Sequence, residues 1–255
     1  MTPRAATAAQ ARTPRPAHGR RRRQFVPPQH GAWAMLVLPY LAGVIVAGFR
    51  WPDLPLLGAW IGGYLLSYYA LQAVKTRRPG RFREQLLLYG AITAPLAVLV
   101  VAVRPEVLWY APGYAVLLAV NAWYAWRRQE RALLNDIAAV AQSCLMVFVT
   151  ATVAGVPLGE VLVAFLAVFG YFTGTVCYVK TMIRERDSVA YRWLSVAYHV
   201  VAFAVAAWLS LPLAVVFGWL LARAWIMPGG RLSPKQVGVI EIGNSALVLV
   251  AVILS

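Results

Sequence analysis

Nine apolar segments follow one another along the chain, separated by short polar connections. They lie near residues 32–49, 54–74, 86–103, 107–126, 134–154, 158–179, 191–209, 211–227 and 237–254. A helix that spans a bilayer needs about 20 predominantly apolar residues. Because lipid offers no hydrogen bonds to the backbone, such segments must bond internally and are helical. The sequence therefore predicts an all-α, polytopic membrane bundle of about nine transmembrane helices.

Composition agrees with this prediction. The 255 residues are 61% hydrophobic and 13% charged, whereas soluble domains are about 25% charged. These values exclude a soluble enzyme, a disordered chain and a secreted disulfide scaffold. Both cysteines, Cys144 and Cys177, fall inside apolar segments without metal-ligand spacing, and we interpret them as buried apolar side chains.

The basic residues alternate along the chain. The first 28 residues and the connections after the second, fourth, sixth and eighth segments hold 22 of the 24 Lys and Arg residues. Only Arg50 and Arg104 fall on the opposite side. Because cytoplasmic loops collect Lys and Arg, this pattern predicts a multi-pass protein of the cell membrane with its N-terminus inside and its C-terminus outside. It also accounts for the net charge of +15, so we expect no nucleic-acid partner.

The chain divides into a tail and one domain. Residues 1–28 are rich in Ala, Pro and Arg and show no apolar period, which predicts a disordered basic cytoplasmic tail. Residues 29–255 form the predicted transmembrane domain. We expect membrane lipids as partners, with Arg20 to Arg23 against anionic headgroups. Nothing in the sequence identifies a protein partner.

Polar residues gather towards the predicted cytoplasmic ends of the segments. An ionisable side chain at a helix centre costs roughly 2.5–3.5 kcal/mol on insertion scales, so those present are candidates for a site. Together they predict a basic, helix-lined cavity that opens to the cytoplasm and binds a phosphate, a carboxylate or an anionic lipid headgroup. The candidates are His30, Gln72, Lys75, Asn121, Arg128, Asn135, Asp136, Tyr178, Lys180, Arg184, His199, Glu241 and Asn244.

Each candidate also has a structural interpretation. Lys and Arg at helix ends set topology and extend to the interface, and Tyr and Trp form an interfacial belt. Asn135 and Asp136 are suited to cap the fifth segment, and Asp136 to pair with Arg131 or another arginine. Glu241 and Asn244 share a helix face, which suits a site, a buried ion pair or a cap. His199 is expected to face the bundle.

No catalytic motif is present in the sequence. It has no P-loop, GxSxG, HExxH or GxGxxG pattern and no metal-ligand spacing, so we assign no catalytic residue, no metal and no cofactor. The spacing of Gly58 and Gly62 matches GxxxG, a weak signal for close helix packing.

Three motifs support a resemblance to a known family. The opening Pro28-Gln29-His30-Gly31-Ala32-Trp33 resembles the Pro-x-x-His-Gly-Ala-Trp start of the YwiC-like membrane proteins. Glu130-Arg131-x-x-x-Asn135-Asp136 and Tyr178-Val179-Lys180-x-x-x-Arg184-Glu185 are also similar to that family. The resemblance covers about residues 27–254. It implies an integral membrane protein and assigns no activity.

A more distant resemblance is to the UbiA-type prenyltransferases. That family has nine helices, an N-terminus inside and two Asp-rich motifs, after helices two and six, that bind Mg²⁺ and an isoprenyl diphosphate. Here the first of these connections, 75–84, has Glu84 as its one acid, and the second has only Glu185 and Asp187. Because Mg²⁺ is held through carboxylates and phosphate oxygens, a usual Mg²⁺ site is not expected. If the chain is an enzyme, arginine and lysine would have to bind the phosphate directly.

Three functions remain open at this point. The first is a UbiA-like bundle whose cavity binds an isoprenoid or another anionic lipid, with or without transferase activity. The second is a transporter or permease for a small anion, which would normally show inverted repeats and broken helices. The third is a non-catalytic accessory subunit of a membrane complex.

Overall fold

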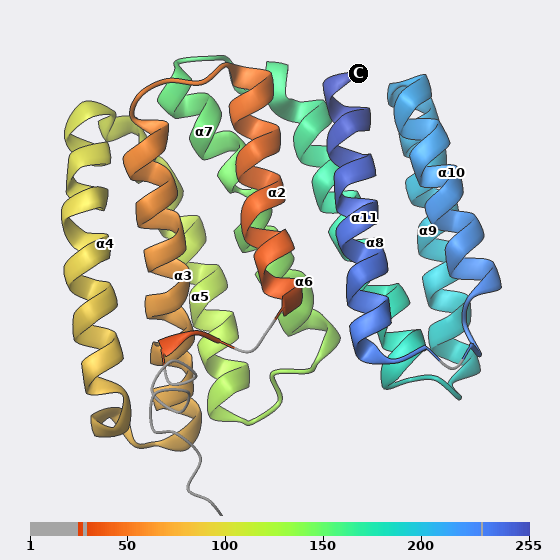
Figure 1. Ribbon diagram of the computed structural model, residues 1–255, viewed down its shortest axis with the longest axis horizontal. Coiled ribbons are helices and arrows are strands. Elements are labelled where there is room, and N and C mark those ends of the chain that lie inside the picture. Colours follow the sequence, from red (N-terminus) through yellow and green to blue (C-terminus); the bar gives the residue numbers. More distant parts are fainter. Residues whose placement is uncertain (1–24, 28–29, 231) are drawn as a thin grey trace, which may run out of the picture.

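The computed structural model describes residues 25–27, 30–230 and 232–255, and in this part of the chain all regular secondary structure is helical (Figure 1). The helices are α2 (His30–Ala47), α3 (Asp53–Thr76), α4 (Arg83–Val103), α5 (Ala111–Trp126), α6 (Leu133–Cys144), α7 (Met146–Ala154), α8 (Leu162–Ile183), α9 (Val189–Leu209), α10 (Leu211–Ile226) and α11 (Pro234–Ile253). Short 3₁₀ turns at Pro79–Phe82, Pro105–Tyr110 and Leu158–Val161 lead into α4, α5 and α8. The predicted tail lies almost entirely outside the described residues.

Each of the nine predicted apolar segments coincides with helix in the structure. Six helical stretches of the described chain are long and apolar enough to cross a membrane, and α2 and α10 are shorter apolar helices. Helices α6 and α7 belong to one such stretch, Leu133–Ala154. They are separated at Leu145, whose carbonyl accepts a hydrogen bond from the Phe148 N–H, three residues on (3.0 Å). The chain is therefore an all-helical protein suited to a membrane.

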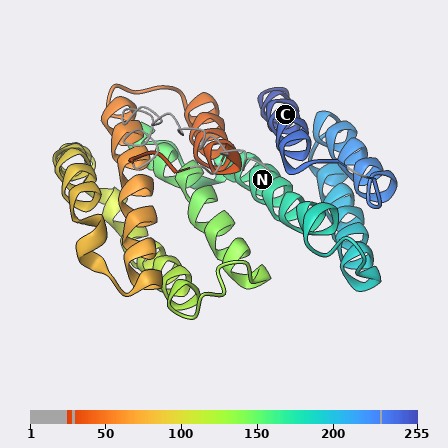
Figure 2. The same ribbon diagram turned by 60° about the horizontal axis from the view of Figure 1, so that its bottom comes forward.

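The helices form two groups. Figure 1 shows α2 to α7 on one side and α8 to α11 on the other, and the turned view of Figure 2 shows the same division. The main core lies where they meet and consists of buried side chains such as Ala42, Val140, Val147, Val168 and Val248. Because small and β-branched residues dominate this core, the helix backbones can approach closely.

Glycines mark the closest of these approaches. A Cβ on Gly43 of α2 would overlap Thr150 Oγ1 and lie 3.0 Å from the Val147 backbone of α7. A Cβ on Gly62 of α3 would overlap Thr93 Oγ1 of α4, and one on Gly58 would lie 2.7 Å from Leu96. The GxxxG spacing at Gly58 and Gly62 therefore marks a real helix contact.

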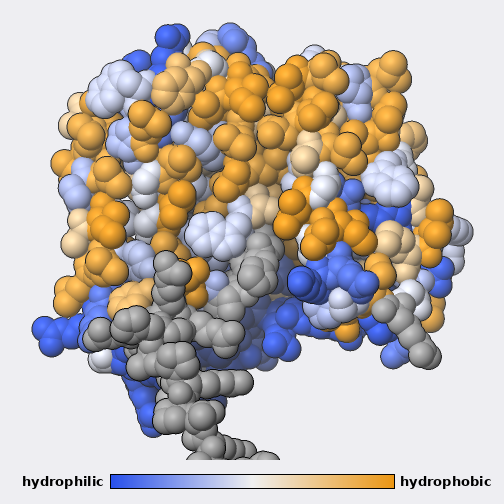
Figure 3. Space-filling model, viewed as in Figure 1, coloured by the Kyte–Doolittle hydropathy of each residue, from blue (hydrophilic) through white to orange (hydrophobic). Residues whose placement is uncertain are grey.

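Charge is concentrated at one end of the bundle. The connections α3–α4, α5–α6, α8–α9 and α10–α11 all lie at the lower end of Figure 1, where α2 begins, and the C-terminus lies at the upper end. Figure 3 shows hydrophobic side chains over most of the visible face and hydrophilic ones mainly towards its lower end. The basic connections predicted to share one side thus share one end.

Candidate functional site

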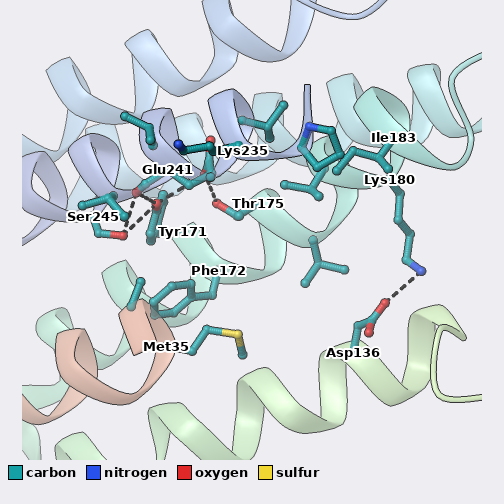
Figure 4. A pocket seen from close by; sticks show the side chains of 18 of the residues that line it. Met35, Asp136, Tyr171, Phe172, Thr175, Lys180, Ile183, Lys235, Glu241 and Ser245 are labelled. Atoms are coloured by element: carbon teal, nitrogen blue, oxygen red, sulfur yellow. Dashed lines mark hydrogen bonds and ion pairs between the residues drawn. The ribbon is translucent and has the colours of Figure 1, made fainter. Parts of the chain in front are cut away.

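A large cavity lies between the two groups of helices. It has a volume of about 750 Å³ and is lined by α2, α6, α8 and α11. Its walls are mainly apolar, with Met35, Phe172, Val179, Ile183 and Ile242 among them. Figure 4 shows polar groups at both ends of this pocket, with Asp136 and Lys180 at one end and Glu241, Tyr171 and Ser245 towards the other.

The lower end of the pocket is basic. Lys180, only 6% exposed, forms an ion pair with Asp136 (2.8 Å) and donates a hydrogen bond to the Arg131 carbonyl (2.6 Å). Arg184, directly after α8, and Lys235, at the start of α11, also line the pocket. Within the described chain neither has a carboxylate within 4 Å. The pocket therefore holds two cationic groups without a carboxylate partner, and their backbones lie at the lower ends of α8 and α11.

The inner end is built around Glu241. Its Oε2 accepts hydrogen bonds from Thr175 (2.8 Å) and from the Tyr171 hydroxyl (3.3 Å), while its Oε1 accepts from Asn244 (3.2 Å) and is paired with Arg223. The Glu241 carbonyl accepts from Tyr171 and from Ser245, both at 2.8 Å. The Tyr171 hydroxyl has one hydrogen to share between the Glu241 carbonyl and Oε2, while Thr175, Asn244 and Arg223 donate to the carboxylate alone, so this acid holds α8, α10 and α11 together.

Sequence reasoning missed Arg223, and it also missed the pocket residues Tyr171, Thr175, Ser245 and Lys235. Arg223 is 1% exposed, in the last turn of α10, and its guanidinium lies over the Tyr178 ring, 4.0 Å from the centroid. The count of basic residues per connection assigns Arg223 to the connection after the eighth segment, whereas it lies inside α10. The available signal was its position inside the predicted segment 211–227, since a charge within an apolar segment needs a buried partner. Glu241 does form a buried ion pair, and its partner is Arg223.

The predicted cap of the fifth segment was also wrong. Helix α6 starts at Leu133 after Ala132, and no side chain caps it. Asn135 and Asp136 lie inside the first turn: Asn135 Nδ2 donates to the Glu130 carbonyl (2.8 Å), and Asp136 pairs with Lys180 rather than with an arginine. Asn135 therefore ties the start of α6 to the α5–α6 connection, and Asp136 ties it to α8. Neither residue caps the helix.

Four of the thirteen candidates, Asp136, Lys180, Arg184 and Glu241, line the pocket. Asn244 and Tyr178 lie behind it: Asn244 bonds to Glu241 and accepts from Trp219 (3.1 Å), and the Tyr178 hydroxyl lies 3.4 Å from the Met227 sulfur. His199 is buried against Gly174 of α8 and bonds through Nδ1 to the Ser195 carbonyl (2.7 Å), so it faces the bundle as expected.

The remaining candidates lie elsewhere. Asn121 donates to the Leu117 carbonyl (2.8 Å) and to Gln142 (3.3 Å) between α5 and α6. The Gln72 carbonyl accepts from the Thr76 hydroxyl within α3 (2.8 Å). Arg128 lines a second hollow at the ends of α3 and α5. His30 opens α2, but its side chain lies outside the described part of the structure.

Lys75 lies outside the pocket and pairs with Glu130 (2.7 Å), which joins the end of α3 to the α5–α6 connection. Partial burial of Glu130 opposes its ionisation, but the hydrogen bond from Lys75 and the positive charges of Lys75 and Arg131 outweigh it. Their net effect lowers the pKa of Glu130 from its ordinary value of 4.5.

The pocket does not fit a magnesium ion. Its two acids, Asp136 and Glu241, are each paired with a buried cation, whereas Mg²⁺ needs carboxylates and phosphate oxygens free to coordinate it. Among the residues that the structure describes, no group of three His, Cys, Asp or Glu side chains is close enough to hold a metal. What the pocket can do is enclose an apolar chain and neutralise an anionic end.

Comparison with known proteins gives a consistent family result. The model of the "YwiC-like protein" family matches residues 26–151. Over 236 residues the chain is 32% identical to "Uncharacterized protein YwiC" of Bacillus subtilis, covering 88% of this chain and 95% of that protein. It is 28% identical to an "Uncharacterized protein" of Haemophilus influenzae, over 89% of this chain and 96% of that one. No solved structure is significantly similar.

Proposed function

This chain belongs to the YwiC-like family, and on that premise we propose that it binds an anionic amphiphile in the cell membrane. The ligand class is an isoprenoid phosphate or another anionic lipid. Its apolar chain lies in the pocket between α2, α6, α8 and α11, and its charged group lies at the lower end. The proposed topology has nine spans, with the N-terminus in the cytoplasm and the C-terminus outside, so that the lower end faces the cytoplasm.

The observation that carries this proposal is the polarity gradient of one pocket. Apolar side chains such as Phe172 and Ile242 line most of it. The cations Arg184 and Lys235, which have no carboxylate partner among the described residues, extend into it from the lower ends of α8 and α11. Thr175 and Arg184 are nine residues apart on or just after α8, which corresponds to roughly 13 Å along a helix axis. A short isoprenoid or acyl segment with a phosphate at one end matches this length and polarity.

The charged group would be held by nitrogen donors alone. Arginine binds phosphate oxygens bidentately, and lysine adds a point charge. Because the two pocket acids are paired with cations, binding should not need Mg²⁺. The distant resemblance to UbiA-type prenyltransferases suggests the isoprenoid as the ligand. If the chain transfers a prenyl group, arginine and lysine would have to bind the phosphate in place of Mg²⁺.

The test is binding of a long-chain isoprenyl diphosphate to the purified protein in phosphatidylcholine nanodiscs, with Mg²⁺ and again with EDTA. We expect saturable binding in both conditions. In the double variant Arg184→Ala/Lys235→Ala we expect the Kd to rise by about a hundredfold, since a charge-assisted hydrogen bond contributes about 1.5–3 kcal/mol. The matched control, Arg78→Ala/Arg81→Ala, removes two exposed arginines at the same end and should bind normally.

Two results would contradict the proposal. Binding that disappears in EDTA would mean a metal site that the pocket acids do not provide. Absence of binding in both conditions would exclude an anionic amphiphile as the ligand. The transporter and the accessory subunit would then be the functions to test.

A further inference from the structure

Helices α3 and α5 end side by side in the same backbone motif. After α3, Arg77 N–H bonds to the Val74 carbonyl (3.2 Å) and Arg78 N–H to the Ala73 carbonyl (3.3 Å). After α5, Arg128 N–H bonds to the Ala125 carbonyl (3.0 Å) and Gln129 N–H to the Tyr124 carbonyl (2.8 Å). Both are Schellman motifs, whose residue just past the helix adopts a left-handed conformation and is usually glycine.

Here both left-handed positions are arginine. Arg77 has φ 55° and Arg128 has φ 58°, and they are the only non-glycine residues with positive φ in the described chain. A side chain is disfavoured in this conformation because its Cβ crowds the following carbonyl. Glycine would close the same motif without that cost. Helix-end charge and membrane topology do not explain the choice, because an arginine one turn earlier would serve both.

The two arginines line one hollow. Together with Arg127 and Trp126 they line an open hollow of about 450 Å³ at the lower end of α3 and α5, apart from the main pocket. The Arg127 guanidinium stacks on Trp123, 4.4 Å from the ring centroid. Both tryptophans are about half exposed, which is typical of side chains at the level of lipid headgroups.

The arginines of the hollow have no carboxylate partner within 4 Å among the described residues. The nearby acid, Glu130, is already paired with Lys75, and this ion pair joins the two helix ends that carry the arginines. Three exposed arginines thus line one hollow without a carboxylate partner among the described residues. Such an arrangement attracts an oxyanion that accepts several charge-assisted hydrogen bonds at once.

We propose that Arg77, Arg127 and Arg128 form a binding site for an anionic phosphate group, separate from the main pocket. The phosphate is carried by an anionic lipid headgroup, whose chains run past Trp123 and Trp126, or it is free in solution. The left-handed backbone places Arg77 and Arg128 in the hollow, and the Lys75–Glu130 ion pair keeps the two helix ends together.

The test uses the full chain in detergent, with bound lipid counted by native mass spectrometry. The probes are phosphatidylglycerol, phosphatidylcholine and inorganic phosphate. The test variant is Arg77→Gly/Arg127→Gln/Arg128→Gly, in which glycine retains the backbone motif. The control variant is Arg78→Gln/Arg81→Gln/Arg192→Gln, which removes three exposed arginines at the same end. Melting temperatures confirm that both variants fold, and we expect that of the test variant to be no lower than that of the unaltered protein.

We expect the unaltered protein and the control variant to retain phosphatidylglycerol, and the test variant to lose at least about tenfold in affinity. Competition by millimolar inorganic phosphate would support a site that also takes free phosphate, and absence of competition would support a lipid-borne phosphate. Equal retention of phosphatidylcholine, or equal losses in both variants, would overturn the proposal. The variant Arg184→Ala/Lys235→Ala should retain this site, so the outcome is independent of the main pocket.

Discussion

At the scale of single residues, the pair Arg223–Glu241 shows most directly how this apolar helix bundle accommodates buried charges. Arg223 is fully buried on α10, and Glu241 lies on α11 among donors from α8. A buried charge without its partner is strongly unfavourable, whereas a paired one is tolerated. The pair therefore binds the last helices to one another and forms the inner end of the pocket.

Removing one member of this pair should cost more than removing both. We expect Arg223→Met to destabilise the protein by about 3–5 kcal/mol, because Glu241 would remain as an uncompensated buried charge. Arg223→Met/Glu241→Leu should recover much of that loss. Melting temperatures in one detergent measure both effects, and a double variant no more stable than Arg223→Met would show that charge compensation is not what the pair provides.

The ion pair Lys75–Glu130 predicts a pH dependence with a definite sign. The pKa of Glu130 is lower in the folded chain than its ordinary value of 4.5. Its contribution to stability is therefore fully present above about pH 4.5 and is lost as the pH falls through the lower, folded value. Glu130→Gln should remove this component and leave the melting temperature nearly unchanged below that range. An identical acid profile in the variant would contradict this account.

Sequence reasoning located several of these residues but not their partners. Glu241, Lys180 and Asp136 were identifiable because charged groups are rare in apolar segments. Arg223 was not, since proximity between α10 and α11 depends on how the helices pack. The left-handed Arg77 and Arg128 give no sequence signal either, because the motif that they close normally carries glycine.

At the scale of helices, close packing through glycine gives a sharp prediction. Gly43→Ala should lower the melting temperature, because its Cβ would meet both Thr150 and the Val147 backbone of α7. Gly90→Ala in α4, whose Cβ would contact nothing within 4 Å, should leave stability unchanged or raise it by up to about 1 kcal/mol through helix propensity. Equal effects at both positions would show that α2 and α7 are not in close contact.

The helices themselves were predictable, because nine apolar segments separated by Pro, Gly and charges leave little freedom in where helices begin and end. The interruption at Leu145 was not, since no proline or glycine marks it. Helix pairing also lay beyond the sequence, apart from the GxxxG spacing that marks the contact of α3 with α4.

At the scale of the whole molecule, the alternation of basic connections predicts opposite sides for two exposed glycines. Gly80 follows α3 and Gly159 precedes α8, and a Cβ at either would contact nothing within 4 Å. In intact cells, a membrane-impermeant maleimide should label Gly159→Cys but not Gly80→Cys, and inverted vesicles should reverse the pattern. Cys144 and Cys177 are buried and should stay unlabelled. Labelling of both variants from one side would contradict the topology.

The pocket cannot be inferred from any single helix, because four helices far apart in the sequence line it. The sequence indicated a basic cavity from charges near helix ends, and its list of thirteen candidates combined residues of the pocket, of the core and of the second hollow. Separating them required the packing of α2 and α11 against α8.

The most direct measurement is therefore photo-crosslinking with an isoprenyl phosphate that carries a diazirine on its chain, followed by peptide mapping. We predict crosslinks on the pocket walls, at Met35 of α2 and at Phe172 and Val179 of α8, which excess unlabelled isoprenyl phosphate abolishes. Crosslinks confined to outward-facing residues of other helices, such as Val98 of α4 or Val201 of α9, both exposed, would contradict the account.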